Sequence, residues 1–248
     1  MNPRRLLGGL LAVVAGLAVA GAARAASILY YVDMVFGTDA MAHALVNVSA
    51  SHAVTTAPTL RDFSREIASG AYDLGIFFQQ NSAGRNYNTA IAALGTFVVG
   101  GGKAIYADWS RNATNGANFD VGYTGDVNFT SLTVVDPALL AGLTNPVGLS
   151  APPTNPTWGF ISFGLTGAAA ATFEGGQAAI VFGNEGRSIT NGFLSDTFVV
   201  RAEGVRLYEN EIGLLLGTPP VPLPAALPLF ASALVGLTGL ALLRQRAR

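Results

Sequence analysis

The fold is most strongly indicated by LGIFF at residues 74–78, by a helical pattern over 88–99 and by KAIYADW at 103–109. The two short apolar runs are typical of strands buried on both faces of a sheet. The segment between them carries apolar residues at helical spacing and ends at three consecutive glycines, namely Ile91, Leu94 and Val98, then Gly100, Gly101 and Gly102. Strand, helix and strand with such short connections predict a parallel pair joined by a right-handed crossover.

The same alternation extends toward the N-terminus. Residues 28–32 form a short apolar strand that ends at Asp33, and Thr38-Asp39 can cap a helix that runs through Val48. A strand at 52–56 then precedes Thr59-Leu60-Arg61-Asp62, which reads as a capping box for a helix that ends at Gly70. The resulting β-α-β-α-β-α-β order predicts an α/β domain with a doubly wound, mostly parallel sheet.

The second half of the domain has a less regular pattern. Residues 119–123 and 127–135 predict a hairpin across Thr124-Gly125-Asp126, followed by a short helix over 137–143. Further strands are expected at 158–163 and 177–182, and Ser195-Asp196 is expected to begin a short helix. Residues 164–176 fit a helix or a loop. A closing helix over 203–216 should turn four residues inward, namely Leu207, Tyr208, Ile212 and Leu215.

Two segments carry a resemblance to a known superfamily: VVDPALLAGL at 134–143, and the late strand and turn over 177–198. With the order of elements over 27–216, they resemble the flavodoxin-like, class I glutamine amidotransferase-like domains, especially the ThuA-like branch. The resemblance implies a flavodoxin-like fold. Its catalytic members place a cysteine on the turn after the strand equivalent to 103–107, with a histidine and a glutamate late in the chain. Here that turn is Asp108-Trp109-Ser110, the chain has no cysteine, and neither His43 nor His52 lies late. The resemblance therefore does not carry the catalytic residues over.

Polar residues follow several predicted strands, and in an open α/β sheet the functional crevice lies at the carboxyl ends of the strands. The candidate ligand-binding residues are Asp33, Asn81, Asp108, Trp109, Asn184 and Glu185. Their carboxylates and amides suit sugar hydroxyls, while Trp109 or Tyr87 offers a flat face for a sugar ring. Asp33, Asp108 and Glu185 would be the acid and base of a glycoside hydrolase. The alternative is that these residues cap helices and shape turns.

Other chemistries are disfavoured by the residues present. Without cysteine, neither a disulfide nor a thiolate metal site can form, and His43 and His52 are poorly spaced for a metal pair. Ser110 lacks a Gly-x-Ser-x-Gly context, and the glycines at 100–102 precede a strand, which is the wrong order for a phosphate cradle. We therefore expect no metal and no cofactor.

The C-terminal residues 219–248 form a sorting tail by their pattern. Residues 226–243 are 18 uncharged, predominantly apolar residues, enough for one short membrane-spanning helix. Arginines directly after such a span favour the cytoplasmic side, so the body should face outward. The elements of the tail are Val221, Pro222, Leu223, Pro224 and Ala225, then the span, then Arg244, Arg246 and Arg248 in a basic end at 244–248. This arrangement resembles the VPLPA variant of the PEP-CTERM signal, and the resemblance implies recognition by an exosortase in the inner membrane of a Gram-negative bacterium. A buried C-terminal core helix is the alternative.

The N-terminal residues 1–25 agree with export. Arg4 and Arg5 precede an apolar segment over 6–20, and Ala23-Arg24-Ala25 offers a small-x-small cleavage site. This pattern predicts a signal peptide read by the secretion translocon, with an uncleaved anchor as the alternative.

The body at 26–218 differs in charge from the whole chain. Six of the 14 lysines and arginines lie in the two ends, so eight remain against all 15 acidic residues, a net charge of about −7. An acidic domain without a basic patch is an unlikely partner for nucleic acid.

Two functional hypotheses follow from the sequence. The first is an exported cell-surface or extracellular-matrix protein with a non-catalytic binding or structural role, where the usual setting of such tails favours association with exopolysaccharide. The second is a carbohydrate-active enzyme that uses the strand-end carboxylates.

Overall fold

A computed structural model describes residues 25–35, 37–127, 129–150 and 162–217. The sorting tail and residues 1–24 of the predicted signal peptide lie outside the described residues. In the part that is described, no helix combines the length and apolar character needed to cross a membrane. The elements are β1 (Ser27–Val32), α1 (Ala40–Val48), β2 (Ala53–Thr56), α2 (Leu60–Ala68), β3 (Leu74–Gln79), α3 (Arg85–Val99), β4 (Lys103–Asp108), α4 (Ala113–Ala117), β5 (Gly122–Val127), β6 (Ser131–Val134), α5 (Pro137–Leu140), β7 (Val147–Gly148), β8 (Ser162–Thr166), β9 (Ala168–Phe173), β10 (Ala178–Gly183), η3 (Asn184–Gly186), β11 (Ser188–Asn191) and α6 (Arg201–Leu216).

A mixed sheet with a parallel centre organises the domain. The strands β2, β1, β3, β4 and β11 lie side by side in that order, and each neighbouring pair is parallel. Beyond β11 the sheet continues through β10, β9, β6 and β7, where every pairing is antiparallel. The ribbon of β5 and β8 joins the sheet where β8 pairs with β10. The predicted α/β fold with a mostly parallel central sheet is confirmed.

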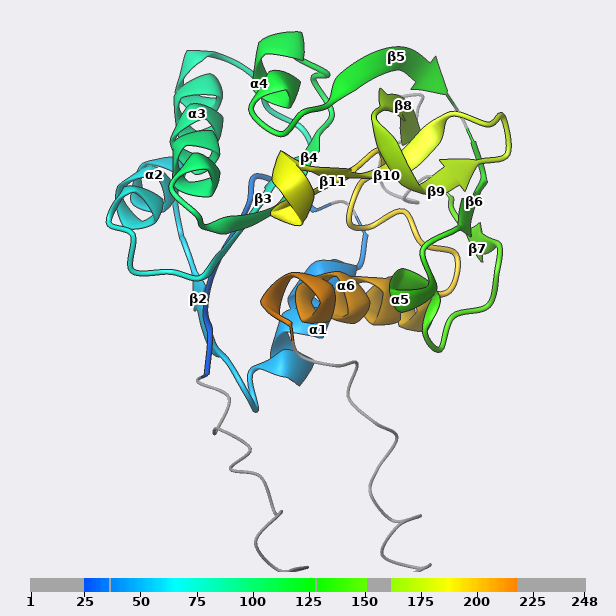
Figure 1. Cartoon of the computed structure of the whole chain (residues 1–248), viewed down its shortest axis with the longest axis horizontal. Coiled ribbons are helices and arrows are strands. Elements are labelled where there is room, and N and C mark those ends of the chain that lie inside the picture. The colour runs from blue at the N-terminus through cyan, green and yellow to red at the C-terminus, as the bar shows by residue number, and fades with distance from the viewer. Residues whose placement is uncertain (1–24, 36, 128, 151–161, 218–248) are drawn as a thin grey trace, which may run out of the picture.

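Helices cover both faces of the parallel strands. Helices α2 and α3 pack on one face and on each other, while α1 and α6 pack together on the opposite face (Figure 1). Because successive side chains of a strand point to opposite faces, Phe77 enters the core beneath α2 and α3, whereas Ile76 and Phe78 enter the core beneath α1 and α6. This explains why the run at 74–78 is apolar at every position.

Helices α1 and α2 begin where the sequence predicts them, and side-chain caps fix these positions. Helices α3 and α6 begin at Arg85 and Arg201, a few residues before their predicted starts, and neither has a side-chain cap. An Asp39 carboxylate oxygen accepts a hydrogen bond from the Ala42 backbone N–H over 3.1 Å at the start of α1. The Thr59 hydroxyl accepts one from the Asp62 N–H over 3.1 Å at the start of α2. Each cap of this kind stabilises a helix by about 1 kcal/mol. Helix α6 ends at Gly217, whose φ of 69° is the left-handed conformation that favours glycine.

The predicted hairpin across residues 124–126 is wrong. Strand β5 runs through these residues and pairs with β8, while β6 pairs with β9 and β7. Gly125 has a φ of 128°, and the pairing shifts register between Tyr123 and Gly125. A glycine with positive φ suits a bulge within a strand as well as a turn, and the local sequence does not distinguish the two.

Three other expectations about the second half need correction. The segment from Ser195 forms turns and isolated bridges instead of a short helix. Most of residues 164–176 belong to strands β8 and β9, so the segment is neither helix nor loop. Strand β11 was not predicted at all. Alanine-rich β9 has low strand propensity, and β11 has only four residues. Pairing with β10 and β6 holds β9 in the sheet, and pairing with β10 and β4 holds β11. The predicted strand at 158–163 lies outside the described residues up to 161, and β8 begins at Ser162.

Candidate functional site

The carboxyl ends of β1, β3 and β4 bring four of the predicted residues to one edge of the sheet. These are Asp33, Asn81, Asp108 and Trp109, which follow directly after the three strands or lie within two residues of their ends. The strand order reverses between β1 and β3, because β2 lies outside β1 and β4 lies outside β3. The crevice of an open α/β sheet forms at such a reversal.

Asp33 holds the loop after β3 to the end of β1. One carboxylate oxygen accepts the Gln80 backbone N–H over 2.6 Å, and the other accepts the N–H groups of Asn81 and Ser82 over 3.0 and 2.7 Å. Burial raises the pKa of Asp33 above its ordinary value, and these backbone hydrogen bonds act in the opposite direction. Consecutive backbone N–H groups of this kind form an anion-binding nest. Here the nest is filled by the protein's own carboxylate.

The segment after β11 closes over the same edge. The Gln80 side chain accepts a hydrogen bond from the Ser195 N–H over 2.5 Å and donates one to the Met34 carbonyl over 2.7 Å. The Gly37 N–H donates to an Asp196 carboxylate oxygen over 3.1 Å. Sequence reasoning missed the roles of Ser195 and Asp196, because a polar pair after an apolar run has the same signature as a helix cap.

Asp108 is fully buried at the end of β4, and nearby residues donate hydrogen bonds to both of its carboxylate oxygens. One carboxylate oxygen accepts the Ser110 N–H and hydroxyl over 2.8 and 2.5 Å, and the other accepts the Tyr106 hydroxyl over 2.8 Å and the Asn115 amide over 3.1 Å. These bonds tie α4 to the strand end. No face of this carboxylate is exposed to a substrate.

Trp109 joins the loops after β3 and β4. Its indole N–H donates to the Ser82 carbonyl over 2.9 Å, and its backbone N–H donates to the Gln79 carbonyl over 3.0 Å. The ring is half-buried. The hydrogen bond to Ser82 orients the indole ring at the carboxyl edge. Because the indole N–H already donates to Ser82, only the ring face is left for a ligand.

Asn184 and Glu185 lie at the opposite edge of the sheet, which corrects the expected convergence of three carboxylates. Strand β10 is antiparallel to β11, so its last residues lie beside the first residues of β11 and β4. Glu185 forms an exposed ion pair of 3.3 Å with Arg187, and its side chain is 86% exposed. The sequence pattern could not show this, because β10 was expected to be one of the parallel strands.

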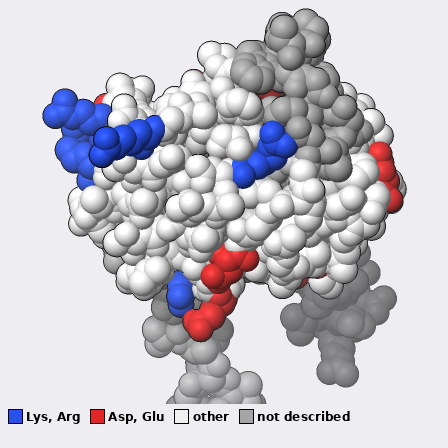
Figure 2. All heavy atoms as spheres, turned by 90° about the horizontal axis from the view of Figure 1, so that it is seen from above, with Lys and Arg blue, Asp and Glu red and all other residues white. Residues whose placement is uncertain are grey.

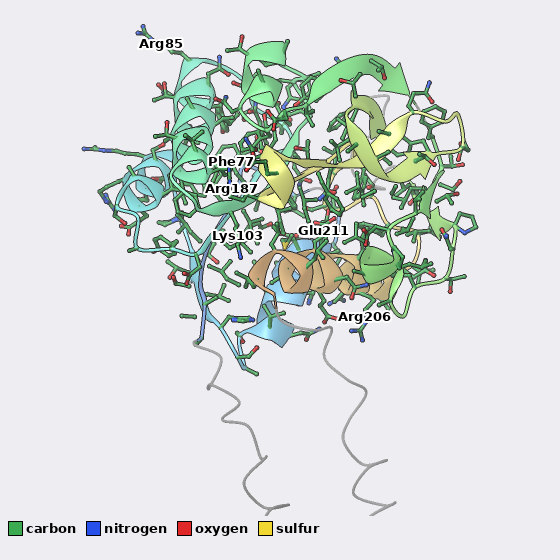
Figure 3. All side chains as sticks on the ribbon, in the orientation of Figure 1. Phe77, Arg85, Lys103, Arg187, Arg206 and Glu211 are labelled. Atoms are coloured by element: carbon green, nitrogen blue, oxygen red, sulfur yellow. The ribbon has the colours of Figure 1, made fainter. Side chains whose placement is uncertain are left out.

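A second polar group lies inside the domain between α6 and the sheet. Glu211 is fully buried, points from α6 toward the sheet (Figure 3), and accepts a hydrogen bond of 3.1 Å from the Asn191 amide. Burial raises the pKa of Glu211 to about 8, and the bond from Asn191 lowers it in part. Glu211 is therefore mostly protonated at neutral pH. No motif in the sequence identified it.

Two hollows of the described surface lie between helices. One, of about 700 Å³, lies between the ends of α2 and α3 and is lined by Tyr72, Phe97 and the glycines at 100–102. The other, of about 530 Å³, is a groove between α1 and α6. On the face seen in Figure 2, charged side chains are few and gather in small groups, basic ones at the left and acidic ones at the lower edge. Within the described ranges, no group of three or more acidic or histidine side chains is arranged to hold a metal ion.

Neither a protein-family model nor a curated protein sequence matches the chain. The fold is similar to that of a protein from Thermoplasma acidophilum provisionally assigned as one of the subunits of GMP synthase, with a TM-score of 0.48, 10% identity, and coverage of 78% of this chain and 95% of that one. It is also similar to part of a β-galactosidase from the psychrophilic Marinomonas ef1, with a TM-score of 0.47 and 11% identity, covering 87% of this chain. The similar region spans 33% of that enzyme. Likenesses this distant carry no conclusion about activity.

Proposed function

We propose that the chain is an exported surface protein whose flavodoxin-like body binds a ligand or serves as a structural component, without catalysis. In this proposal residues 1–25 direct export, residues 26–218 form the body, and residues 219–248 are recognised by an exosortase after insertion in the inner membrane. The strand order β2-β1-β3-β4-β11 corresponds to the 2-1-3-4-5 order of flavodoxin-like sheets, which supports this description of the body.

The observation that carries the non-catalytic role is the state of the three strand-end carboxylates. Asp33 and Asp108 are saturated by hydrogen bonds from their own loops, and Glu185 lies at the other edge. Glycoside hydrolysis needs two carboxyl groups facing one another across an open cleft. The described residues at this edge offer no such pair, and nothing in the structure favours the carbohydrate-active enzyme over the binding role.

The ends of the body are compatible with a membrane-anchored precursor. The chain enters the described body at the start of β1, and α6 ends beside the start of β4, where the Lys103 ammonium donates to the Leu215 carbonyl. Both points lie on the same side of the molecule (Figure 1). An anchor attached there would leave the carboxyl edge facing away from the membrane.

Expression of the full chain in a Gram-negative host, with and without an exosortase of the matching type, tests this proposal. With the enzyme, we expect a product that has lost the tail and has left the inner membrane. The double variant Pro222→Ala, Pro224→Ala should remain in the inner membrane with its tail intact. A chain that stays in the cytoplasm with both ends uncut would contradict the proposal.

A further inference from the structure

The groove between α1 and α6 carries polar and cationic side chains that the proposed function has not used. Helix α1 begins after β1, at the carboxyl edge, and α6 packs along it. Arg201 is the first residue of α6, and His43 lies in the first turn of α1. The lining side chains are His43, Asn47, Arg201, Ala202, Val205, Arg206 and Glu209.

Arg201 and His43 form the upper part of the groove. A terminal guanidinium nitrogen of Arg201 lies against the imidazole ring of His43. Among the residues that the structure describes, no carboxylate forms an ion pair with Arg201. An arginine fork matches the two oxygens of a carboxylate, and here the protein itself supplies none.

Glu209 is the acidic member of the groove, and two neighbours compensate its charge. It forms an ion pair of 2.9 Å with Arg206, and it accepts a hydrogen bond of 2.6 Å from the Asn47 amide. The groove therefore keeps the positive charge of Arg201 in a body whose net charge is about −7. This local reversal of sign favours an anionic ligand over a cationic one.

We propose that the α1–α6 groove binds the carboxylate of an acidic sugar unit, such as a uronate in a polysaccharide chain. Arg201 pairs with the carboxylate, and the imidazole of His43 and the amide of Asn47 contact the sugar hydroxyls. An open groove between two helices admits a unit within a long chain, which an enclosed cavity does not. The inference names a ligand class for the surface role proposed above and rests on that role for its setting.

Binding of trigalacturonate to the purified full chain in detergent micelles tests the inference, with the neutral galactose trisaccharide of the same linkage as the matched ligand. Calorimetry should detect trigalacturonate only, and binding should weaken as salt is added. Arg201→Gln should weaken it by on the order of tenfold or more, because a charge-assisted hydrogen bond is lost. The control variant is Arg85→Gln, since Arg85 is likewise an exposed first residue of a helix, on the opposite face of the sheet (Figure 3).

The two histidines of the chain give a second readout that does not depend on affinity. Trigalacturonate should shift the imidazole proton resonance of His43 and leave that of buried His52 in place. The inference is overturned if trigalacturonate does not bind, if the neutral sugar binds equally, or if Arg201→Gln retains full affinity. The binding test uses purified chain, so its result concerns only the groove. Failure of the export test in cells would not change the binding result, and the two proposals can fail separately.

Discussion

Asp33 joins two loops at the carboxyl edge. Three backbone N–H groups of the loop after β3 donate to its carboxylate, and no other described side chain takes its place. Asp33→Ala should lower the free energy of unfolding by about 2–4 kcal/mol, since three partly buried donors lose a charged acceptor. Thermal unfolding of the full chain in detergent, followed by near-ultraviolet circular dichroism, measures the loss.

Asp33→Asn is the matched control, because an amide oxygen keeps part of the acceptor capacity. It should lose less stability than Asp33→Ala. A ligand-binding or catalytic carboxylate would behave differently, because its removal commonly leaves stability unchanged or raises it. An Asp33→Ala variant as stable as the wild type would therefore refute the structural role.

The buried carboxyl group of Glu211 should make the stability of the domain depend on pH. Its pKa is about 8 in the folded chain and near 4.5 when unfolded. Between these values the folded state binds more protons at Glu211 than the unfolded state, so the contribution of Glu211 to stability is greatest below about pH 4.5 and falls as the pH rises toward 8. The contribution changes by about 1.4 kcal/mol per pH unit at most. Glu211→Gln should flatten this fall in unfolding temperature between pH 5 and 8.

Glu209→Gln provides the comparison for Glu211→Gln on the same helix. Glu209 lies in the groove and pairs with Arg206, so its replacement removes a carboxyl group from α6 and leaves Glu211 untouched. The fall in stability between pH 5 and 8 should therefore remain in Glu209→Gln. If Glu211→Gln and the wild type show the same fall, the carboxyl group of Glu211 is not buried in its neutral form.

At the scale of elements, Gly204 shows how α6 meets the segment after β11. A Cβ atom at this position would overlap the ring of Phe198, which itself packs edge-on against Tyr208 with ring centroids 5.7 Å apart. By helix propensity alone, alanine in place of glycine would stabilise a helix interior by about 1 kcal/mol. Gly204→Ala should nevertheless destabilise the domain by about 1–3 kcal/mol, because the ring must move.

The double variant Gly204→Ala, Phe198→Leu distinguishes overlap from other causes. If the ring is responsible, the smaller side chain should recover part of the unfolding temperature lost in Gly204→Ala. A stabilised Gly204→Ala variant would show that the first turns of α6 pack more loosely than the structure indicates.

The elements differ in how far the sequence predicts them, for physical reasons. The strands at 28–32, 74–78 and 103–109 each contain an apolar run of at least four residues in a β-α repeat, and local pattern and long-range pairing agree there. Strands β9 and β11 have no such pattern, because their conformation depends on β10 between them. Strand direction also determined which predicted site residues lie together. Asp33 and Asp108 lie at the ends of parallel strands and meet at one edge, whereas Glu185 follows an antiparallel strand and lies at the other edge.

The roles of the residues at the edge were harder to predict than their positions. A polar residue after a strand can bind a ligand or hold a loop, and the sequence pattern is the same in both cases. The hydrogen bonds to Asp33 and Asp108 decide between them. Buried Glu211 and the pairing of Arg201 with His43 depend on contacts between elements far apart in the chain, which periodicity alone does not reveal.

At the scale of the whole molecule, the two described ends lie on one side and the carboxyl edge faces another direction (Figure 1). If residues 226–243 span the membrane, at most about 30 Å of extended chain connects the span to Gly217. The body would then stay close to the membrane until the tail is cut. The start of α3, where Figure 3 labels Arg85, would face outward.

Cysteine labelling in cells tests the central claim, which is that the body lies outside the cytoplasm. The chain has no native cysteine, so one introduced thiol reports on one position. Arg85→Cys places the thiol at the start of α3, which faces outward in this account. Ala71→Cys places it on the side where the described chain begins and ends. Arg85 and Ala71 are both exposed in the native structure. A membrane-impermeant maleimide should label Arg85→Cys in intact spheroplasts, and Ala71→Cys more slowly. Labelling of both variants only after lysis would show that the body remains in the cytoplasm and would contradict the account.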